Sequence, residues 1–291
     1  MYDIDVPGYE TEGVNRLHLF DLDSIEENLV PENDINFDKN EIEKNLTLFL
    51  YPDDSDRAGQ VLRIYQQYFM VSNGAQLILK EAKERGADLH QLHEYVAIQI
   101  NDTHPSMVIP ELIRLLQLEG FTMDEAIAEV RKTCAYTNHT ILAEALEKWP
   151  QGLIQSLLPR VWQIIREINI RWGAYLREAF QGDGARVERC LILAGGSVHM
   201  ANLCQAVCFK INGVSALHGE ILQRDLFRDV CALRPERYTF VTNGIDHRRW
   251  LDQVNPALSG LVCELIGGGW RKHPEELKGL RAFENDPAVL D

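Results

Sequence analysis

The sequence predicts an α/β fold in which helices flank a mainly parallel sheet. β-prone runs at residues 95–100, 134–137 and 238–242, with a shorter one at 191–193, alternate with longer segments of helical periodicity. This alternation is typical of parallel strands, because each parallel pair needs a long crossover connection. The pattern indicates one incomplete α/β domain.

Residues 1–50 are weakly patterned. Leu17, Leu19 and Phe20 alternate with polar residues and predict a strand. Asp38 is a candidate N-cap for a short helix that reaches Leu50. Residues 51–57 are expected to form a loop, because Pro, Asp and Ser favour turns.

The remaining helices are predicted from apolar stripes at helical spacing and from end signals. The stripes lie over residues 59–85, 110–118, 153–180 and 200–226. Gly86 supplies a stop for the first helix, and Thr122 with Glu125 forms a capping box before another helix. Asn212-Gly213 is expected to interrupt the last helix.

Composition excludes several classes of partner. The 291 residues carry 44 acidic and 29 basic side chains, a formal net charge of −15. Such a charge argues against nucleic acid or an anionic membrane surface, and it suits a neutral ligand such as a sugar. No apolar run approaches the roughly 20 residues that a membrane span needs, and the start does not resemble a signal peptide.

The six cysteines form no C-x-x-C pair. Free thiols in a reducing compartment explain them best, so we expect a cytoplasmic protein. The histidines show no H-x-x-x-H or H-E-x-x-H spacing, so no metal site is expected.

Polar groups follow two successive predicted strands. Asn101, Asp102 and His104 come directly after the run at 95–100, and His139 follows the run at 134–137. Because parallel strands end at one edge of a sheet, these side chains are expected to share a pocket. Carboxylates accept hydrogen bonds from hydroxyl groups, and imidazole both donates and accepts, so the pocket suits a sugar. A helix carrying Glu144 and Glu147 is expected next.

Each of these groups also has a structural interpretation. Asp102 could cap the following helix, and His139 could be a buried core histidine. The acidic loop that includes Asp54 and Ser55 is either a solvated turn or a mobile lid over a substrate. The sequence shows no nucleotide-binding motif, no lysine in a cofactor context and no convincing acid–base pair, so it indicates a binding half-site without catalytic residues.

Several collinear blocks resemble the α-1,4-glucan (glycogen, starch and maltodextrin) phosphorylase family. The similarity runs from Val6 to about Val262, and its firmest blocks are Leu50-Tyr-Pro-Asp-Asp-Ser55, Val96-Ala-Ile-Gln-Ile-Asn-Asp-Thr-His-Pro105, Thr137-Asn-His-Thr140, Glu144-Ala-Leu-Glu-Lys-Trp-Pro150 and Val241-Thr-Asn-Gly244. The sequence departs from the family pattern at His18, Phe20 and Ala143, and none of these is a proposed glucose-binding position.

The resemblance implies a two-domain GT-B glycosyltransferase with pyridoxal phosphate between the domains. Such enzymes use inorganic phosphate to release glucose 1-phosphate from α-1,4-glucan, and they are commonly homodimers. Residues 1–262 would be the later part of the amino-terminal, glucan-binding domain, and residues 263–291 a helical segment near the domain junction. The carboxyl-terminal domain, which binds the cofactor, would be absent.

The resemblance also implies roles for individual residues. His139 would hydrogen-bond the 6-hydroxyl of the glucose at the cleavage subsite, and Asp102 and His104 would line the pocket beside it. Asp54 and Ser55 would lie on a gate loop over the active site.

Two functions are therefore expected. The first is a fragment of an α-glucan phosphorylase that is inactive by itself, because the cofactor lysine and the phosphate-binding residues lie outside it. The alternative is a non-catalytic truncated protein that binds glucan or an intact phosphorylase.

Overall fold

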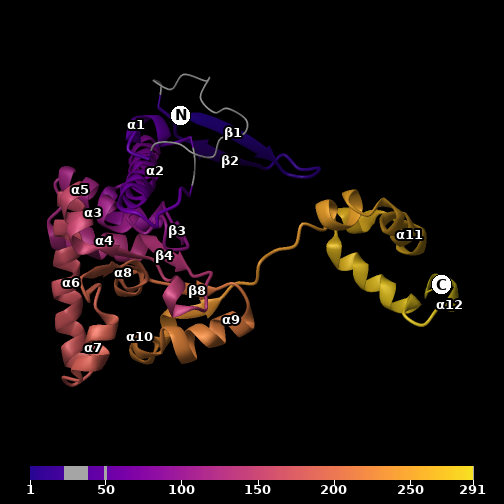
Figure 1. Cartoon of the computed structure of the whole chain (residues 1–291). Coiled ribbons are helices and arrows are strands. Elements are labelled where there is room, and N and C mark those ends of the chain that lie inside the picture. Colours follow the sequence, from indigo (N-terminus) through magenta and orange to yellow (C-terminus); the bar gives the residue numbers. More distant parts are fainter. Residues whose placement is uncertain (23–38, 49–50, 291) are drawn as a thin grey trace. The chain divides into compact units, whose positions relative to one another are not determined.

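The computed structural model describes residues 1–22, 39–48 and 51–290. The chain separates into two compact units, residues 20–242 and residues 1–19 with 243–291 (Figure 1). The larger unit contains every residue of the predicted pocket. The proposed N-cap Asp38 lies outside the described residues.

A parallel sheet forms the centre of the larger unit, as predicted. Its strands are β3 (Ile98–Asn101), β4 (Cys134–Thr137), β8 (Ile211–Gly213) and β9 (Tyr238–Phe240). They pair in the order β3-β4-β8-β9, and every pairing is parallel.

The third strand corrects the prediction of a helix over residues 200–226. That segment contains α8 (Met200–Val207), strand β8, α9 (Ala216–Ile221) and a π-helical turn (Leu222–Leu226). Gly213 ends β8 close against α9, where a β-carbon would lie 2.9 Å from the backbone nitrogen of Gly219. Asn212-Gly213 is thus part of a strand rather than a helix break.

Most helices near the sheet follow the predictions, but the helix over 153–180 is divided, and the helices over residues 184–190 and 228–233 were not predicted. The helices are α2 (Arg57–Glu84), α3 (Val108–Leu118), α4 (Met123–Thr133), α5 (Gln151–Leu157), α6 (Pro159–Ala179), α7 (Gly184–Cys190) and α10 (Arg228–Leu233). The capping box of Thr122 and Glu125 is confirmed. The predicted helix over 153–180 is divided at Pro159, which lacks a backbone N–H and disfavours helix at the residue before it.

A small antiparallel sheet replaces the expected helix that carries Glu144 and Glu147. Its strands are β5 (Lys148–Pro150), β6 (Leu193–Ala194) and β7 (Ser197–His199), in the order β5-β7-β6. Glu144 lies in a single 3-10 turn (Ala143–Ala145), and Glu147 directly precedes β5. Pairing of Trp149 with Val198 draws this segment into extended structure.

The smaller unit contains a hairpin of β1 (Tyr2–Pro7) and β2 (Val14–Leu19), which confirms the strand predicted near Leu17. It also contains α11 (Pro256–Ile266), 3-10 segments and α12 (Pro287–Leu290). In the larger unit, the helix predicted up to Leu50 is limited to α1 (Ile42–Asn45) within the described residues.

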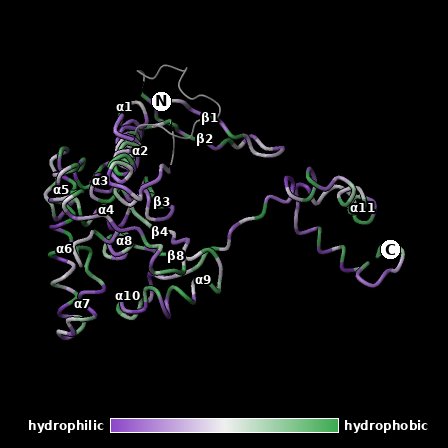
Figure 2. The backbone as a smooth tube through the Cα atoms, viewed as in Figure 1, coloured by the Kyte–Doolittle hydropathy of each residue, from purple (hydrophilic) through white to green (hydrophobic). Residues whose placement is uncertain are grey.

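Apolar side chains of the sheet and its helices form one core. Its fully buried members include Ile100, Leu112, Tyr136, Ile164 and Trp172. Each such side chain contributes roughly 1.5–3 kcal/mol through burial. Hydrophobic and hydrophilic residues alternate along α6, so only one stripe of it faces the core (Figure 2). No helix in the described ranges is both long enough and apolar enough to cross a lipid bilayer.

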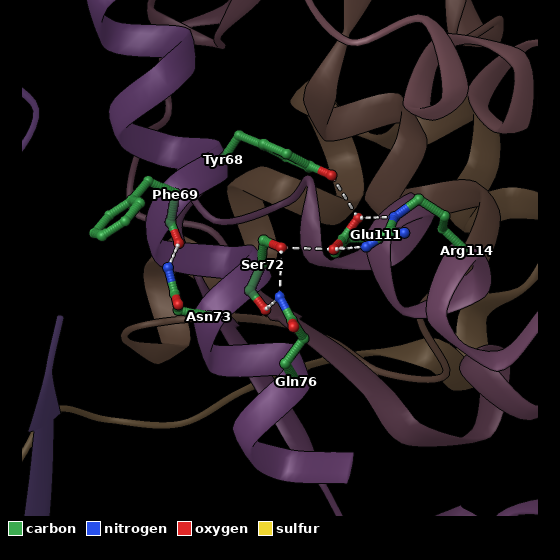
Figure 3. A network of polar contacts seen from close by, with 7 residues as sticks. All are labelled: Tyr68, Phe69, Ser72, Asn73, Gln76, Glu111 and Arg114. Atoms are coloured by element: carbon green, nitrogen blue, oxygen red, sulfur yellow. Dashed lines mark hydrogen bonds and ion pairs between the residues drawn. The ribbon is translucent and has the colours of Figure 1, made fainter. Parts of the chain in front are cut away.

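A buried carboxylate connects α2 to α3. Glu111 is completely buried and accepts hydrogen bonds from Tyr68 (2.9 Å) and Ser72 (2.7 Å) of α2 (Figure 3). Arg114 donates to both of its oxygens, at 2.8 and 2.7 Å. Burial raises the pKa of Glu111, but the hydrogen bonds from Arg114, Ser72 and Tyr68 together outweigh it, so the pKa lies below its ordinary value.

We predict that Glu111→Gln lowers the free energy of unfolding by about 2–4 kcal/mol, because it leaves Arg114 without its counter-charge. The depressed pKa makes the stabilisation complete above the ordinary glutamate value of 4.5, and it is lost as pH falls through the lower folded-state value. Urea unfolding of both proteins between pH 3 and 8 measures the difference, which should shrink at the acid end.

The matched control is Glu84→Gln, because the Glu84 side chain is 63% exposed and lies 3.9 Å from Lys80. This surface pair should contribute less than about 1 kcal/mol. If both variants lost the same free energy of unfolding, the result would contradict a special role for Glu111.

Candidate functional site

The carboxyl ends of β3 and β4 lie side by side, as predicted. Asn101 is in register with Thr137, the last residue of β4. Two residues later in the chain, His139 Nε2 lies 2.6 Å from Asn101 Oδ1. The polar groups that follow the two strands therefore meet at one sheet edge.

His139 is exposed, so the alternative of a buried core histidine is wrong. Its neighbour Asn138 is fully buried instead and donates to the Tyr136 hydroxyl at 3.0 Å. The Asn138 side-chain oxygen also accepts from the backbone N–H of Thr140 at 3.0 Å. This side-chain turn fixes the backbone and directs His139 outward.

Asp102 makes the turn that follows β3. Its backbone has a φ of +66°, a left-handed conformation that Asp tolerates better than most residues. The Asp102 carboxylate accepts from the N–H of Thr103 at 2.7 Å, and its own N–H donates to the Thr137 carbonyl at 2.9 Å. The next helix, α3, has no side-chain cap, so the alternative in which Asp102 caps it is wrong.

A cavity of about 220 Å³ opens beside this turn. Its lining comes from the first half of α2, the loop before α2, the end of β3 and the loop after it, and consists of Tyr51, Arg63, Gln66, Gln67, Met70, Val71, Asn101, His104 and Pro105. The His104 ring meets the Tyr51 ring edge to face, with centroids 5.5 Å apart. Tyr51 and Asp102, at φ of +59° and +66°, are both in a backbone conformation that is uncommon outside glycine and concentrated at functional sites.

Glu147 lies directly behind the cavity wall and was not predicted as a site residue. Its side chain is only 10% exposed, accepts from Gln67 at 2.8 Å and lies 3.7 Å from Arg63. Its second oxygen is buried without a hydrogen-bond partner among the described residues. Burial raises the pKa of Glu147, although Gln67, His104 and Arg63 partly oppose the shift.

The acidic loop before α2 is held in place by local contacts. Asp56 is the N-cap of α2, Asp53 accepts from Ser55 Oγ at 2.9 Å, and both aspartates lie 3.1 Å from Lys39. The loop packs so closely on α2 that a β-carbon at Gly59 would lie 1.9 Å from the carbonyl oxygen of Asp53. Asp54 is half-buried and lies 3.6 Å from Arg63, so it faces a cavity-lining residue, whereas Ser55 is exposed and is not one of the lining residues.

The geometry allows His139 to recognise a hydroxyl group. Asn101 Oδ1 can only accept a hydrogen bond. With the amide in this orientation, His139 Nε2 therefore carries a hydrogen and donates it to Asn101. In the neutral ring the other nitrogen, Nδ1, is then an acceptor. No group in the described part of the chain bonds to Nδ1, which can accept from a ligand hydroxyl.

Comparison with known proteins identifies the family of this chain. The family model described as "Carbohydrate phosphorylase" matches residues 1–291. The chain belongs to the carbohydrate phosphorylase family. The family has the GT-B fold, in keeping with the helix-flanked parallel sheet.

Individual relatives match over the whole chain but only over part of their own length. The maltodextrin phosphorylase of Streptococcus pneumoniae is 52% identical over 292 residues, which cover 100% of this chain and 38% of that protein. The glycogen phosphorylase of Bacillus subtilis is 42% identical, covering 100% and 36%. The rabbit (Oryctolagus cuniculus) muscle glycogen phosphorylase is 38% identical, covering 99% and 36%. The chain thus spans less than two fifths of each of these relatives.

The structure brings together some predicted site residues and adds others. His139 contacts Asn101, Asn101 and His104 line the cavity, and Asp54 approaches it through Arg63. The sequence did not indicate Arg63, Gln67 and Glu147 as site residues. They lie up to 84 residues apart in the sequence and come together only when α2 packs against the segment that leads into β5. The one available signal was that Glu147 lies in the block from Glu144 to Pro150, which resembles the phosphorylase family.

We predict that Glu147→Gln raises the free energy of unfolding at pH 7 by on the order of 1 kcal/mol, because a neutral amide avoids burying a charge with one unpaired oxygen. Between the ordinary value of 4.5 and the raised folded-state pKa, the folded chain binds a proton that the unfolded chain has released. The stability of the wild type therefore falls as pH rises through that window, and the stability of the variant should not. Thermal unfolding from pH 4 to 8 measures how the stability of each protein depends on pH.

The control is Glu144→Gln, which changes an exposed carboxylate three residues away. The stability of this variant should depend on pH as that of the wild type does. A Glu147→Gln protein that is less stable than the wild type at pH 7 would show that the charged form is the stabilised one.

Proposed function

We propose that this chain supplies the glucan-binding part of an α-1,4-glucan phosphorylase, an enzyme that uses inorganic phosphate to release glucose 1-phosphate from the end of a glucan. One observation carries the proposal. The exposed His139 is joined through Asn101 to a cavity at the carboxyl edge of the parallel sheet.

The size and chemistry of the cavity suit one sugar ring. The cavity, at about 220 Å³, is smaller than the roughly 300–1,000 Å³ that is usual for binding sites of small molecules, so it suits a ligand no larger than about one sugar ring. Arg63, Gln67, Asn101 and His104 offer both donors and acceptors to hydroxyl groups, and the exposed Tyr51 ring offers an apolar face. In this proposal His139 binds the 6-hydroxyl, Asp102 and His104 line the subsite, and Asp54 and Ser55 form the gate loop.

The cofactor of the family, pyridoxal phosphate, needs a lysine amine for its Schiff base and cations for its phosphate. The cavity at the sheet edge has no lysine in its lining. The residues of this cavity therefore do not fit the cofactor, and we propose that they bind sugar only.

The identity of the relatives supports the assignment over the alternative of an unrelated sugar-binding protein. Maltodextrin and glycogen phosphorylases match from end to end of this chain. In the whole enzyme we propose a cytoplasmic homodimer with glucan, inorganic phosphate and glucose 1-phosphate as ligands. A non-catalytic protein that binds glucan remains the second candidate, because the chain spans only 36–38% of those relatives.

His139→Ala is predicted to weaken the binding of maltoheptaose to the 291-residue chain by about tenfold or more, the equivalent of about 1.4 kcal/mol for a lost hydrogen bond. Isothermal titration calorimetry measures both dissociation constants. His273→Ala is the control, because His273 is also exposed but belongs to the smaller unit. Equal affinities in the wild type and the His139 variant would remove His139 from the site.

The same purified chain is predicted to form no glucose 1-phosphate from maltoheptaose and phosphate, even with added pyridoxal phosphate. A coupled assay for glucose 1-phosphate measures this. Turnover by the 291-residue chain would contradict the assignment of catalysis to parts of the enzyme beyond it. Failure of maltoheptaose to bind would instead contradict the glucan site itself.

A further inference from the structure

A second cavity, of about 370 Å³, lies in the larger unit. Its walls come from the segment that leads into β5, from β7 and α8, from the end of α7, and from the π-helical turn with the start of α10. Here α7 and α10 lie side by side (Figure 1). The cavity shares no lining residue with the sheet-edge cavity. Its volume is within the roughly 300–1,000 Å³ that is usual for binding sites of small molecules.

Three basic side chains line this cavity from three separate elements. Lys148 belongs to β5, Arg189 to the last turn of α7, and Arg228 to the start of α10. All three residues are exposed, so a ligand in the cavity can reach their charged groups. The fold, rather than a local sequence motif, brings them to one place.

The antiparallel pairing of β5 with β7 turns Lys148 toward the cavity. Lys148 is in register with His199, which also lines the cavity, so the two side chains lie on the same face of the small sheet. The next pair along the ladder is buried and belongs to the opposite face.

The electrostatics of the His199 ring agree with this placement. Burial lowers the pKa of His199, and the hydrogen bond from its ring to the Ala194 carbonyl opposes the shift. The positive charge of Lys148 lowers the pKa further, and the negative charge of Glu188 raises it. The ammonium group of Lys148 therefore lies near the ring, whereas Glu188 does not line the cavity.

Two aspartates also line the cavity, but arginines neutralise both of them. Asp229 is 2.9 Å from Arg189 and 3.0 Å from Arg186, and its side chain is only 14% exposed. Asp225 is 2.9 Å from Arg224. Arg189 contacts Asp229 through Nε and Nη2, which leaves Nη1 for a ligand. The carboxylates are thus engaged and do not cancel the basic groups of the lining.

A surplus of positive charge remains at the cavity. Lys148 and Arg228 make no ion pair with any residue that the structure describes. The lining residues and their ion-pair partners include five Lys or Arg side chains and two Asp side chains, so their net charge is 5 − 2 = +3. The whole chain carries −15. A basic cavity on an acidic protein attracts anions to that place.

Apolar side chains form another part of the wall. Leu146 and Leu226 are half-buried at the cavity, and the buried Phe227 also lines it. The amide of Asn202 is already engaged, because it donates to two backbone carbonyls at 3.0 and 2.8 Å and accepts from Gln205 at 3.0 Å. A bare inorganic ion would leave the apolar wall uncovered, whereas an organic anion would cover it.

We propose that this cavity binds a small organic anion. Its acidic group, a carboxylate or a phosphate monoester, is held by Lys148, Arg189 and Arg228, and its apolar body lies against Leu146 and Leu226. Both kinds of acidic group present several acceptor oxygens to ammonium and guanidinium donors. The site is separate from the proposed glucan site and does not rest on it.

The test uses the 291-residue chain and four compounds that separate the charge from the apolar body. Phenyl phosphate and benzoate carry both, inorganic phosphate carries the charge alone, and benzyl alcohol carries the ring alone. Isothermal titration calorimetry at constant ionic strength gives each dissociation constant. Phenyl phosphate or benzoate should bind about tenfold more tightly than either single-feature compound. The tighter of the two aromatic anions identifies the acidic group.

Lys148→Gln and Arg228→Gln, made separately, should each weaken binding of that aromatic anion about tenfold, because each removes a charge-assisted hydrogen bond. Both variants should melt at the wild-type temperature, since neither side chain has an ion-pair partner in the described ranges. A loss of affinity in one variant alone would place the acidic group beside that residue.

Two matched variants are the controls. Arg166→Gln removes one charge from an exposed position of α6 outside the cavity, and it should bind the anion as the wild type does. Arg63→Gln should also leave binding unchanged, because Arg63 lines the sheet-edge cavity instead.

Three results would overturn the proposal. The first is that neither aromatic anion binds more tightly than inorganic phosphate and benzyl alcohol. The second is that both cavity variants bind the anion as Arg166→Gln does. The third is a loss of binding confined to Arg63→Gln, which would place the anion in the sheet-edge cavity.

Discussion

The parallel pairing of β3 with β4 is the constraint on which the candidate site depends. In-register pairing of Asn101 with Thr137 puts the two strand ends at one edge, and the Asp102 N–H extends the ladder by one more bond to Thr137. A shift of one residue would turn alternate side chains to the opposite face and separate His139 from Asn101. The register is held by buried Ile100 and Tyr136, so the apolar core also positions the polar site.

Polar side chains of the candidate site are held in place by buried groups behind them. Asn138 is buried so that His139 is exposed, and Glu147 holds Gln67 from behind the cavity wall. Glu111 likewise joins α3 to α2, the helix that supplies most of the cavity lining. Each of these groups exchanges solvation for several hydrogen bonds, which is favourable only when the partners are fixed. At Glu147 this exchange is incomplete, because one of its oxygens has no hydrogen-bond partner among the described residues.

Local signals allowed much of the fold to be predicted from the sequence. The capping box at Thr122 depends on residues three apart, and the end of β4 follows from the β-prone run before Asn138. Pro159 was visible too, but the apolar stripe continues through α5 and α6 and hid the break. Strand β8 has three residues, which is too short for any periodicity to show, and it forms because β4 and β9 pair with it on either side. The contacts of Glu147 with Arg63 and Gln67 depend on packing between distant segments, which local patterns do not encode.

The central claim is that the His139 ring at this edge binds a sugar hydroxyl through Nδ1. Nitrogen-15 NMR of the histidine rings during titration with maltoheptaose tests it most directly. We predict that Nδ1 of His139 shifts while Nε2 keeps its hydrogen and its bond to Asn101, and that the ring of His273 does not change. An unchanged His139 ring at saturating maltoheptaose would contradict the account.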